Sequence, residues 1–182
     1  MLFRSTRTTT LFPYTTLFRS GVAPAPALGR VSSTPPGTHA GNLDNRELVA
    51  GTSLFIPVFV PGALFEIGDG HAAQGDGEVD QTAIETSLRA KIQLTVRKGM
   101  TLTWPRAETP AAYISMATDK DLTVATKAAI QEMIDFLAAT KGLSKHEAYQ
   151  LTSIAGDVVV TQLVDQTLGV HVKMPKSIFK NK

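Results

Sequence analysis

The 182-residue sequence contains no cysteine. Disulfide frameworks, thiolate zinc sites and cysteine nucleophiles are therefore excluded, and the composition is compatible with a reducing, cytoplasmic location. An excess of either charge is missing too, because 18 Lys and Arg face 16 Asp and Glu, for a formal net charge of +2. This balance gives no electrostatic support for binding a nucleic acid or an anionic membrane, so neither is expected as a partner.

Long apolar runs are also missing. The longest extends from Leu54 to Leu64 and is interrupted by Pro57, Pro61 and Gly62, so it is too short to span a bilayer. The N-terminus lacks the continuous apolar segment of a secretory signal. Phosphate-binding loops, dinucleotide fingerprints and GxSxG turns are absent. What remains is an ordinary globular composition, 43% hydrophobic and 19% charged, at a length suited to one domain with its own core.

The first twenty residues repeat themselves irregularly. LFRS occurs at residues 2–5 and 17–20, and TTLF occurs at 9–12 and 15–18. Each unit is too short to form a supersecondary repeat. The stretch resembles translated sequencing adapter, so we expect residues 1–20 to be non-native. Residues 21–182 are then the C-terminal portion of a single domain whose native front part is missing. The alternative is a genuine Thr-rich, disordered N-terminus.

The apolar pattern predicts strands first, then two helices, then strands again. β-branched, aromatic or alternating segments predict strands at 54–60, 63–67, 84–97, 100–104, 112–117, 158–164 and 170–174. Before them, the Pro- and Gly-rich segment 21–37 has the composition of an extended linker.

Apolar residues recur at helical spacing from residue 122 to 137, with Gly142 suited to a C-cap. Ser144 and Glu147 form a capping box for a second helix, which Gly156 ends. This order predicts an α+β fold, with a β-rich, sandwich-like, mostly antiparallel sheet and a two-helix insertion at about 120–156.

The segment GDGHAAQGDGE, residues 68–78, carries the densest polar chemistry of the chain. Its glycines allow close backbone approach, so it can fold around a small ligand. Histidine nitrogen and carboxylate oxygen are ligands of divalent metals, and Asp69 and His71 would point the same way on a strand. Asp76 and Glu78 have the same spacing, and Glu78 would act as base to a metal-bound water. The alternative is a polar hairpin with Asp-Gly turns, and the spacing alone does not decide.

Two further polar features are ambiguous. Residues 39–47 include His39, Asn42 and Asp44, which could simply form turns and caps. His171 lies in an expected strand, where a single histidine is more often a core or edge residue than a ligand.

Five stretches occur in a fixed order along the chain. They are GVAPA (21–25), GNLDNRELVAGTSLFIPVFVPGALFEIGDGHAAQGDGEV (41–79), TAIET (82–86), RAETP (106–110) and PKSIF (175–179). Together they resemble the acetamidase/formamidase family from about residue 21 to 179. The resemblance implies a cytoplasmic hydrolase that cleaves the C–N bond of small linear amides, such as formamide and acetamide, to a carboxylate and ammonia. It also implies a β-rich sandwich-like fold, and assembly as a homo-oligomer when full length. Ala40 stands where many relatives have Gly.

The resemblance favours a site over the hairpin. The residues that match the family's polar loop are Asp69, His71, Gln74, Asp76 and Glu78, and Asn42 and Asp44 match its Gly-Asn-x-Asp segment. The expected metal ligands are His71, Asp69, Asp44 and Asp76, with zinc as the preferred divalent ion. Glu78 is expected to take a proton from water and deliver it to the leaving nitrogen, and Gln74 or Asn42 to hydrogen-bond the amide. Two alternatives stay open, namely an inactive fragment and a non-catalytic metal- or ligand-binding β-module.

Overall fold

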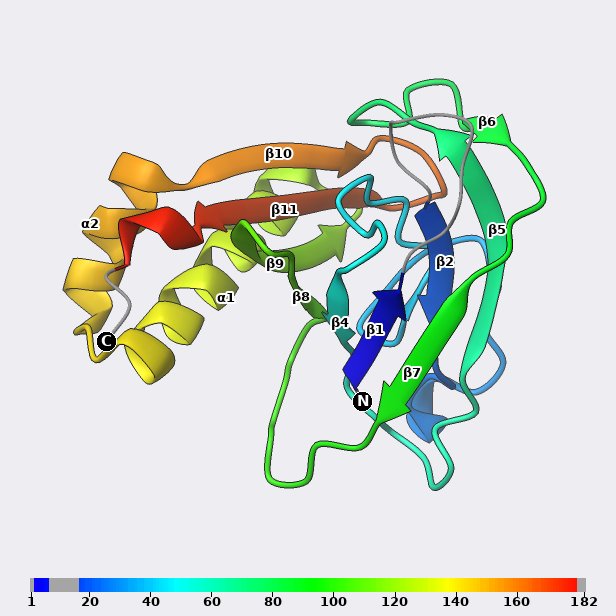
Figure 1. Ribbon diagram of the computed structural model, residues 1–182, viewed down its shortest axis with the longest axis horizontal. Coiled ribbons are helices and arrows are strands. Elements are labelled where there is room, and N and C mark those ends of the chain that lie inside the picture. Colours follow the sequence, from blue (N-terminus) through cyan, green and yellow to red (C-terminus); the bar gives the residue numbers. More distant parts are fainter. Residues whose placement is uncertain (1, 7–16, 180–182) are drawn as a thin grey trace.

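A computed structural model describes residues 2–6 and 17–179 (Figure 1). In this part of the chain, strands form two antiparallel sheets and two helices pack on one of them. The strands are β1 (Leu2–Thr6), β2 (Leu17–Gly21), β3 (Ala40–Gly41), β4 (Ser53–Phe55), β5 (Glu66–Ala73), β6 (Ile84–Glu85), β7 (Lys91–Thr95), β8 (Arg106–Glu108), β9 (Ala112–Asp119), β10 (Asp157–Gln162) and β11 (Leu168–Pro175). The helices are α1 (Leu122–Lys141) and α2 (Lys145–Ala155), with short 3-10 turns η1 (Pro26–Leu28) and η2 (Lys176–Ile178).

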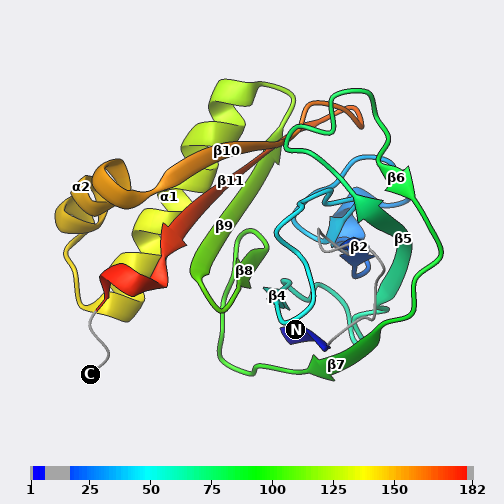
Figure 2. The same ribbon diagram turned by 45° about the horizontal axis from the view of Figure 1, so that its top comes forward.

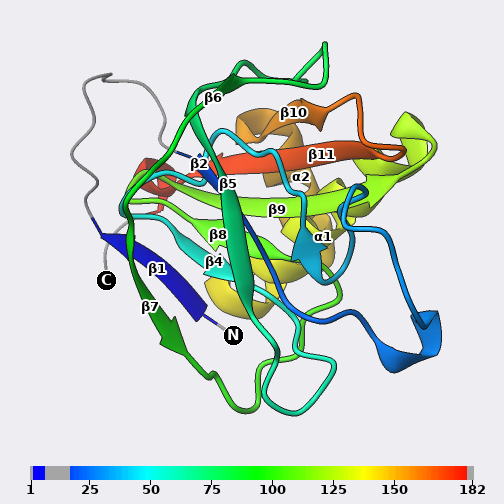
Figure 3. The same cartoon turned by 90° about the vertical axis from the view of Figure 1, so that its right-hand side faces the viewer.

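The described strands divide into a larger sheet of order β10-β11-β9-β8-β4-β1-β7 and a smaller sheet of order β3-β2-β5-β6. In Figure 3 the smaller sheet lies in front of β4, β8 and β9. The core between the sheets draws on both of them. Its buried members are Val22, Ala40, Leu43, Leu54, Ile56, Ala63, Ala107, Ile114 and Met116. The predicted sandwich-like arrangement is therefore confirmed.

A second core joins the larger sheet to the helices (Figure 2). The buried side of α1, formed by Ala125, Ala129, Met133, Ile134 and Leu137, packs against β9 and β11. Strand β9 contributes to both cores because its successive side chains point to opposite faces of the sheet. Ile114 and Met116 belong to the core between the sheets, whereas Ala117 belongs to the helix core. No helix in the described ranges is long and apolar enough to cross a membrane.

The two-helix insertion is confirmed with its predicted ends. Gly142 follows α1 in the left-handed conformation, with φ 69°. The Ser144 side chain accepts a hydrogen bond from the Glu147 amide, and the Glu147 carboxylate accepts one from the Ser144 amide. These signals act within a few residues, so the sequence alone is enough to read them. The α+β class with mostly antiparallel strands is confirmed as well.

Several strand boundaries were predicted wrongly. The strand expected at 54–60 is reduced to Ser53–Phe55, ahead of Pro57, which has no amide to donate to a ladder. The strand expected at 63–67 begins only at Glu66, because Ala63 and Leu64 turn the chain with φ values of 57° and 51°. Strand β5 then runs to Ala73 and contains the first half of the polar motif.

Other expected elements differ more. The strand predicted over 84–97 is two short strands, β6 and β7, which belong to different sheets. No strand forms at 100–104, and β8 occupies 106–108 instead. The expected linker at 21–37 is not a free spacer, because Val22 is buried in the core between the sheets. The prediction that residues 1–20 are non-native stays a prediction. Within these residues the structure describes β1 and most of β2, and the rest lies outside the described part of the chain.

Candidate functional site

His71 on β5 is fully buried, and its two ring nitrogens have different surroundings. Nδ1 lies 2.8 Å from Oε1 of Gln74. The Gln74 amide nitrogen donates to the main-chain oxygen of Asp44 at 2.5 Å, so Gln74 Oε1 is left to accept. This network assigns the proton to Nδ1 of His71 and leaves a lone pair on Nε2.

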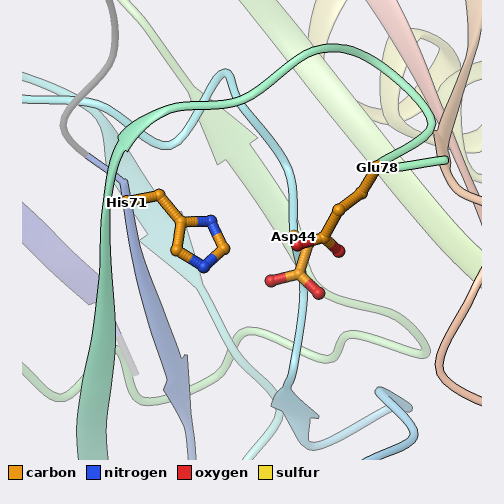
Figure 4. Close-up of side chains that lie close together, drawn as sticks. All are labelled: Asp44, His71 and Glu78. Carbon is orange, nitrogen blue, oxygen red and sulfur yellow. The ribbon is translucent and has the colours of Figure 1, made fainter. Parts of the chain in front are cut away.

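The Nε2 atom of His71 faces carboxylates on several sides. Asp69 Oδ1 lies 3.4 Å away and Glu85 Oε1 lies 3.2 Å away. Potential ligand atoms of buried Asp44, His71 and Glu78 also lie within 4.8 Å of one another (Figure 4). Neither His71 Nε2 nor the Glu78 carboxylate oxygens have a hydrogen-bond partner among the described residues. Buried polar atoms without partners are rare, and here they converge on one point.

The two buried carboxyl groups influence one another. Burial is the largest cause that raises the pKa of Asp44 well above its usual range, and the adjacent Glu78 raises it further. Burial also raises the pKa of Glu78. Two neighbouring carboxyl groups with little water around them share one proton unless a cation lies close. A cation beside Asp44 and Glu78 is therefore stabilised.

Arg19 on β2 supplies positive charge to the cluster. Its Nε lies 2.6 Å from Asp44 Oδ1 and 2.5 Å from Asp69 Oδ2. Its terminal nitrogen lies 3.6 Å from Glu78 Oε1. Reasoning from the sequence missed Arg19 because residues 1–20 had been set apart from the fold.

Two acidic residues of the motif have left-handed backbone conformations. Asp69 has φ 53° and is the extra residue where the β2–β5 register shifts between Gly68 and Gly70. Glu78 has φ 40°. Such conformations cost of order 1–3 kcal/mol for a non-glycine residue and gather at functional sites. The bulge at Asp69 brings its carboxylate to the side on which His71 lies.

The loop after β5 is anchored to the end of β10. Gly77, with φ 90°, donates from its amide to the Thr161 oxygen at 3.1 Å and accepts from the Leu163 amide at 2.8 Å. Gln162, fully buried, accepts from the Asp44 amide at 3.3 Å and donates to Asp44 Oδ2 at 3.2 Å. Asp44 is therefore held from a segment 118 residues away along the chain.

A cavity of about 570 Å³ adjoins the cluster. Its polar lining includes Arg19, Asp69, Asn42 and His39, and its apolar lining includes Val22, Leu64 and Ile67. The side chain of Asn42 is nearly buried, at 5% exposure, and its Nδ2 has no hydrogen-bond partner in the described part of the chain. An amide donor is thus available beside a space large enough for a small molecule.

The structure brings most of the predicted site residues together. Those that meet around His71 are Asp44, Asp69, Gln74 and Glu78, and Asn42 lies on the cavity wall. Asp76 does not join them, because its exposed carboxylate pairs with Arg46 at 3.4 Å. Glu85 was missed. It lies opposite His71 in the β5–β6 pair, and the single strand expected over 84–97 concealed that pairing.

His171 is a separate buried histidine on β11. It is fully buried, and its Nδ1 lies 2.8 Å from the Thr161 hydroxyl. Burial is the main cause that lowers its pKa to about 3. It is a core residue, as its place in a strand predicted.

The fold and the site together define the class of this protein. Two antiparallel sheets and a helix pair hold a buried histidine among carboxylates, and a cavity lies beside it. A family profile described as the Acetamidase/Formamidase family matches residues 23–181, and the chain belongs to this family.

Relatives of known name agree with this assignment. The acetamidase of Mycolicibacterium smegmatis is 44% identical over 48 residues, which are 26% of this chain and 12% of that protein. The formamidase of Methylophilus methylotrophus is 40% identical over 47 residues, again 26% and 12% of the two chains. The chain therefore matches only a small share of these relatives' length.

Solved structures match over most of the chain. The acetamidase of Bacillus halodurans superposes with a TM-score of 0.84 at 32% identity, covering 92% of this chain and 57% of that one. The acetamidase of Yersinia enterocolitica gives a TM-score of 0.87 at 32% identity, covering 93% of this chain and 51% of that one. The chain spans about half the length of these structures.

Proposed function

We propose that this chain carries the reaction centre of an amidohydrolase that converts small linear amides, such as formamide and acetamide, to a carboxylate and ammonia. Family membership supports amide hydrolysis as the reaction class. The observation that carries the proposal is the unpartnered Nε2 of buried His71, which faces carboxylates next to a cavity.

The side chains fit a divalent metal ion, with zinc proposed. One imidazole nitrogen and several carboxylate oxygens, all close together and partly without partners, form the donor set that zinc accepts. His71 and Asp69 would hold the ion, with Asp44 or Glu85 completing the set. Asp76 is left out because it lies at the surface. When bound, such an ion polarises an amide carbonyl and lowers the pKa of a water molecule.

The remaining residues have distinct parts in the proposal. Glu78 accepts the proton of the attacking water, and burial raises the pKa of its carboxyl, which makes the carboxylate a stronger base. Asn42 donates from its free Nδ2 to the carbonyl oxygen of the substrate. Gln74 has both side-chain polar atoms engaged with His71 and Asp44, so it orients the histidine rather than contacting the amide.

Ammonia release from formamide and acetamide tests the proposal in the metal-loaded protein. We expect Glu78→Gln to keep its metal and to lose activity by roughly 100-fold or more, because general-base catalysis contributes about that much. Asp76→Asn is the matched control, since it removes a carboxylate from the same loop without touching the cluster. Full activity in metal-loaded Glu78→Gln would exclude Glu78 as the base.

Two observations favour a second candidate, an inactive fragment. The chain covers only 57% and 51% of the two solved relatives, and exposed apolar side chains include Ile84 on β6 and Leu94 on β7. Binding of a hydrophobic dye without ammonia release would support this candidate. Metal binding without ammonia release would instead support a non-catalytic metal-binding module. Cytoplasmic location and homo-oligomeric assembly, which the family resemblance implies for the full-length protein, stay part of the proposal.

A further inference from the structure

The proposed reaction requires a proton at the nitrogen that leaves, because an amide nitrogen departs readily only when protonated. Glu78 does not line the cavity among the described residues, so it is poorly placed to reach a substrate nitrogen there. His39 does line it, together with Asn42 and Asp69. The cavity therefore has an acid–base side chain that the mechanism described so far does not use.

His39 is held in place by its own turn. The Gly37 amide donates to the Ala40 oxygen at 3.0 Å, and the Ala40 amide donates to the Gly37 oxygen at 2.9 Å. The Val22 amide donates to the His39 oxygen at 3.1 Å, which ties the turn to the segment after β2. Ala40 has φ 65°, a conformation that is costly for alanine, so the tight turn is maintained against local strain.

The imidazole fits against two glycines. A Cβ atom at Gly37 would lie 3.1 Å from both Nδ1 and Cε1 of His39. A Cβ atom at Gly41 would lie 3.3 Å from Nε2. Both distances are shorter than ordinary van der Waals contacts, so an added Cβ atom at either place would shift the ring by a few tenths of an ångström. The lack of a side chain at Gly37 and at Gly41 thus leaves room for the His39 ring in this position.

The ring of His39 has no hydrogen-bond partner within residues 2–6 and 17–179. Partial burial lowers its pKa, which makes the protonated ring a stronger acid. A neutral imidazole can take up a proton at its lone pair, and the resulting imidazolium can give a proton to a substrate.

We propose that His39 is the catalytic proton donor to the leaving nitrogen, an inference that rests on the proposed amidase function. Water oxygen bonds to the carbonyl carbon while Glu78 takes the water proton. His39 has first taken a proton from water in the cavity at its lone pair, so that it is an imidazolium ion. When the C–N bond breaks, its electron pair stays with nitrogen, and the imidazolium of His39 gives nitrogen a proton, so that ammonia leaves and the ring is neutral again. Glu78 returns the proton of the attacking water to solvent. One water is consumed, and one carboxylic acid and one ammonia are formed.

The test compares two substrates in the metal-loaded chain. Acetamide needs a protonated leaving group, whereas p-nitrophenyl acetate releases a phenolate that needs none. We expect His39→Gln to lower kcat for acetamide about 100-fold, with KM changed less than about 3-fold, and to lower ester turnover less than about 3-fold. His146→Gln is the matched control, because His146 is exposed on α2 away from the cavity. Zinc affinity, measured by calorimetric titration, is expected to be the same in all three proteins.

Each contrary result has a defined meaning. Equal losses on both substrates, or weaker zinc binding in His39→Gln, would overturn the donor role. If the unmodified chain hydrolyses no amide, the proposed function fails and the donor role falls with it. If the chain hydrolyses acetamide and His39→Gln does so equally well, only the donor role fails.

A second variant covers the case in which His39→Gln does not fold. Gly37→Ala keeps the imidazole but pushes it from its place, and Gly75→Ala is its control, because a Cβ atom there meets nothing within 4 Å. We expect Gly37→Ala to lower kcat for acetamide selectively, and unchanged activity relative to Gly75→Ala would overturn the proposal.

Discussion

The Nδ1 atom of His71 donates to the side-chain oxygen of Gln74 at 2.8 Å, and this contact leaves Nε2 facing the carboxylates. We predict that Gln74→Leu weakens zinc binding by about 10- to 100-fold, because an unheld ring loses its fixed tautomer and orientation. The same change leaves the Asp44 main-chain oxygen without its partner, which costs about 1–3 kcal/mol of stability. Competition with a chelator measures the first effect and urea denaturation the second. Unchanged zinc affinity would show that Gln74 does not orient the ligand.

Removal of Arg19 is predicted to strengthen metal binding. Its guanidinium contacts Asp44 and Asp69 at 2.6 and 2.5 Å, so a divalent ion must displace it. We expect Arg19→Gln to raise zinc affinity about 10-fold or more, since the ion no longer competes with an internal cation. Arg46→Gln removes an arginine whose ion pair with Asp76 lies at the surface, and it is expected to leave zinc affinity unchanged. An equal or lower affinity in Arg19→Gln would mean that Arg19 supports the site instead.

Arg19 lies within residues 1–20, so the origin of this stretch decides whether Arg19 is native. Sequencing the source DNA across the codon for Ser20, with a library free of adapters, tests whether they are native. If the reading frame continues upstream into other family-like sequence, residues 1–20 are non-native, and the corrected DNA gives the natural residue at the place of Arg19. If the DNA reads as the chain does, Arg19 is a native occupant of the cluster.

His171 is predicted to make stability depend on pH. Its pKa is lowered to about 3 in the folded chain, and an unfolded histidine titrates near 6.5. Between these values the unfolded chain binds more protons, so stability is complete above about pH 6.5 and falls as the pH is lowered. At about 1.4 kcal/mol per unit, the loss from pH 7 to 5 is about 2 kcal/mol. Urea denaturation at both pH values should show a smaller loss in His171→Gln and an unchanged loss in His146→Gln. Equal pH dependence in His171→Gln and the unmodified chain would contradict this account.

Replacement of Leu64 by glycine is predicted to stabilise the fold. Its side chain is 66% exposed, and its φ of 51° lies in the left-handed region. Leu64→Gly removes the steric cost of that conformation, which is about 1–2 kcal/mol, and loses little buried surface. Leu28→Gly, at a similarly exposed leucine without a positive φ, should give no gain. A lower urea midpoint in Leu64→Gly would show that the leucine contributes packing that outweighs the strain.

The sequence predicts local features of this fold well and distant pairings poorly. The Ser144–Glu147 capping box and the Gly142 cap act within a single helical turn, so no tertiary information is needed to find them. Strand β7 appears in the sequence as the continuation of β6, although it joins the other sheet. Only pairing with another segment distinguishes one strand from two, and residue patterns carry little of that information.

Within the candidate site too, the sequence reveals residues that are close along the chain and misses partners from distant segments. Asp69, His71, Gln74 and Glu78 lie within one short motif, and reasoning from residue types finds them together. Glu85 reaches His71 through strand pairing, and Gln162 reaches Asp44 from the end of β10. Neither has a local signature, because an isolated glutamate or glutamine in a strand is usually a solvent-facing residue. Asp76 shows the converse, since a matching local pattern did not bring it to the cluster.

The hydrogen bonds between Asp44 and Gln162 have a consequence for the order of folding. The helix pair and strands β9 to β11 are close in sequence, so their contacts can form early, at a small entropic cost. Gln162, which bonds both the amide and the carboxylate of Asp44, becomes available only when a loop of more than 100 residues has closed. We therefore expect the cluster to be completed in the last folding step, so that acquisition of zinc affinity would mark the arrival of the chain at its native state.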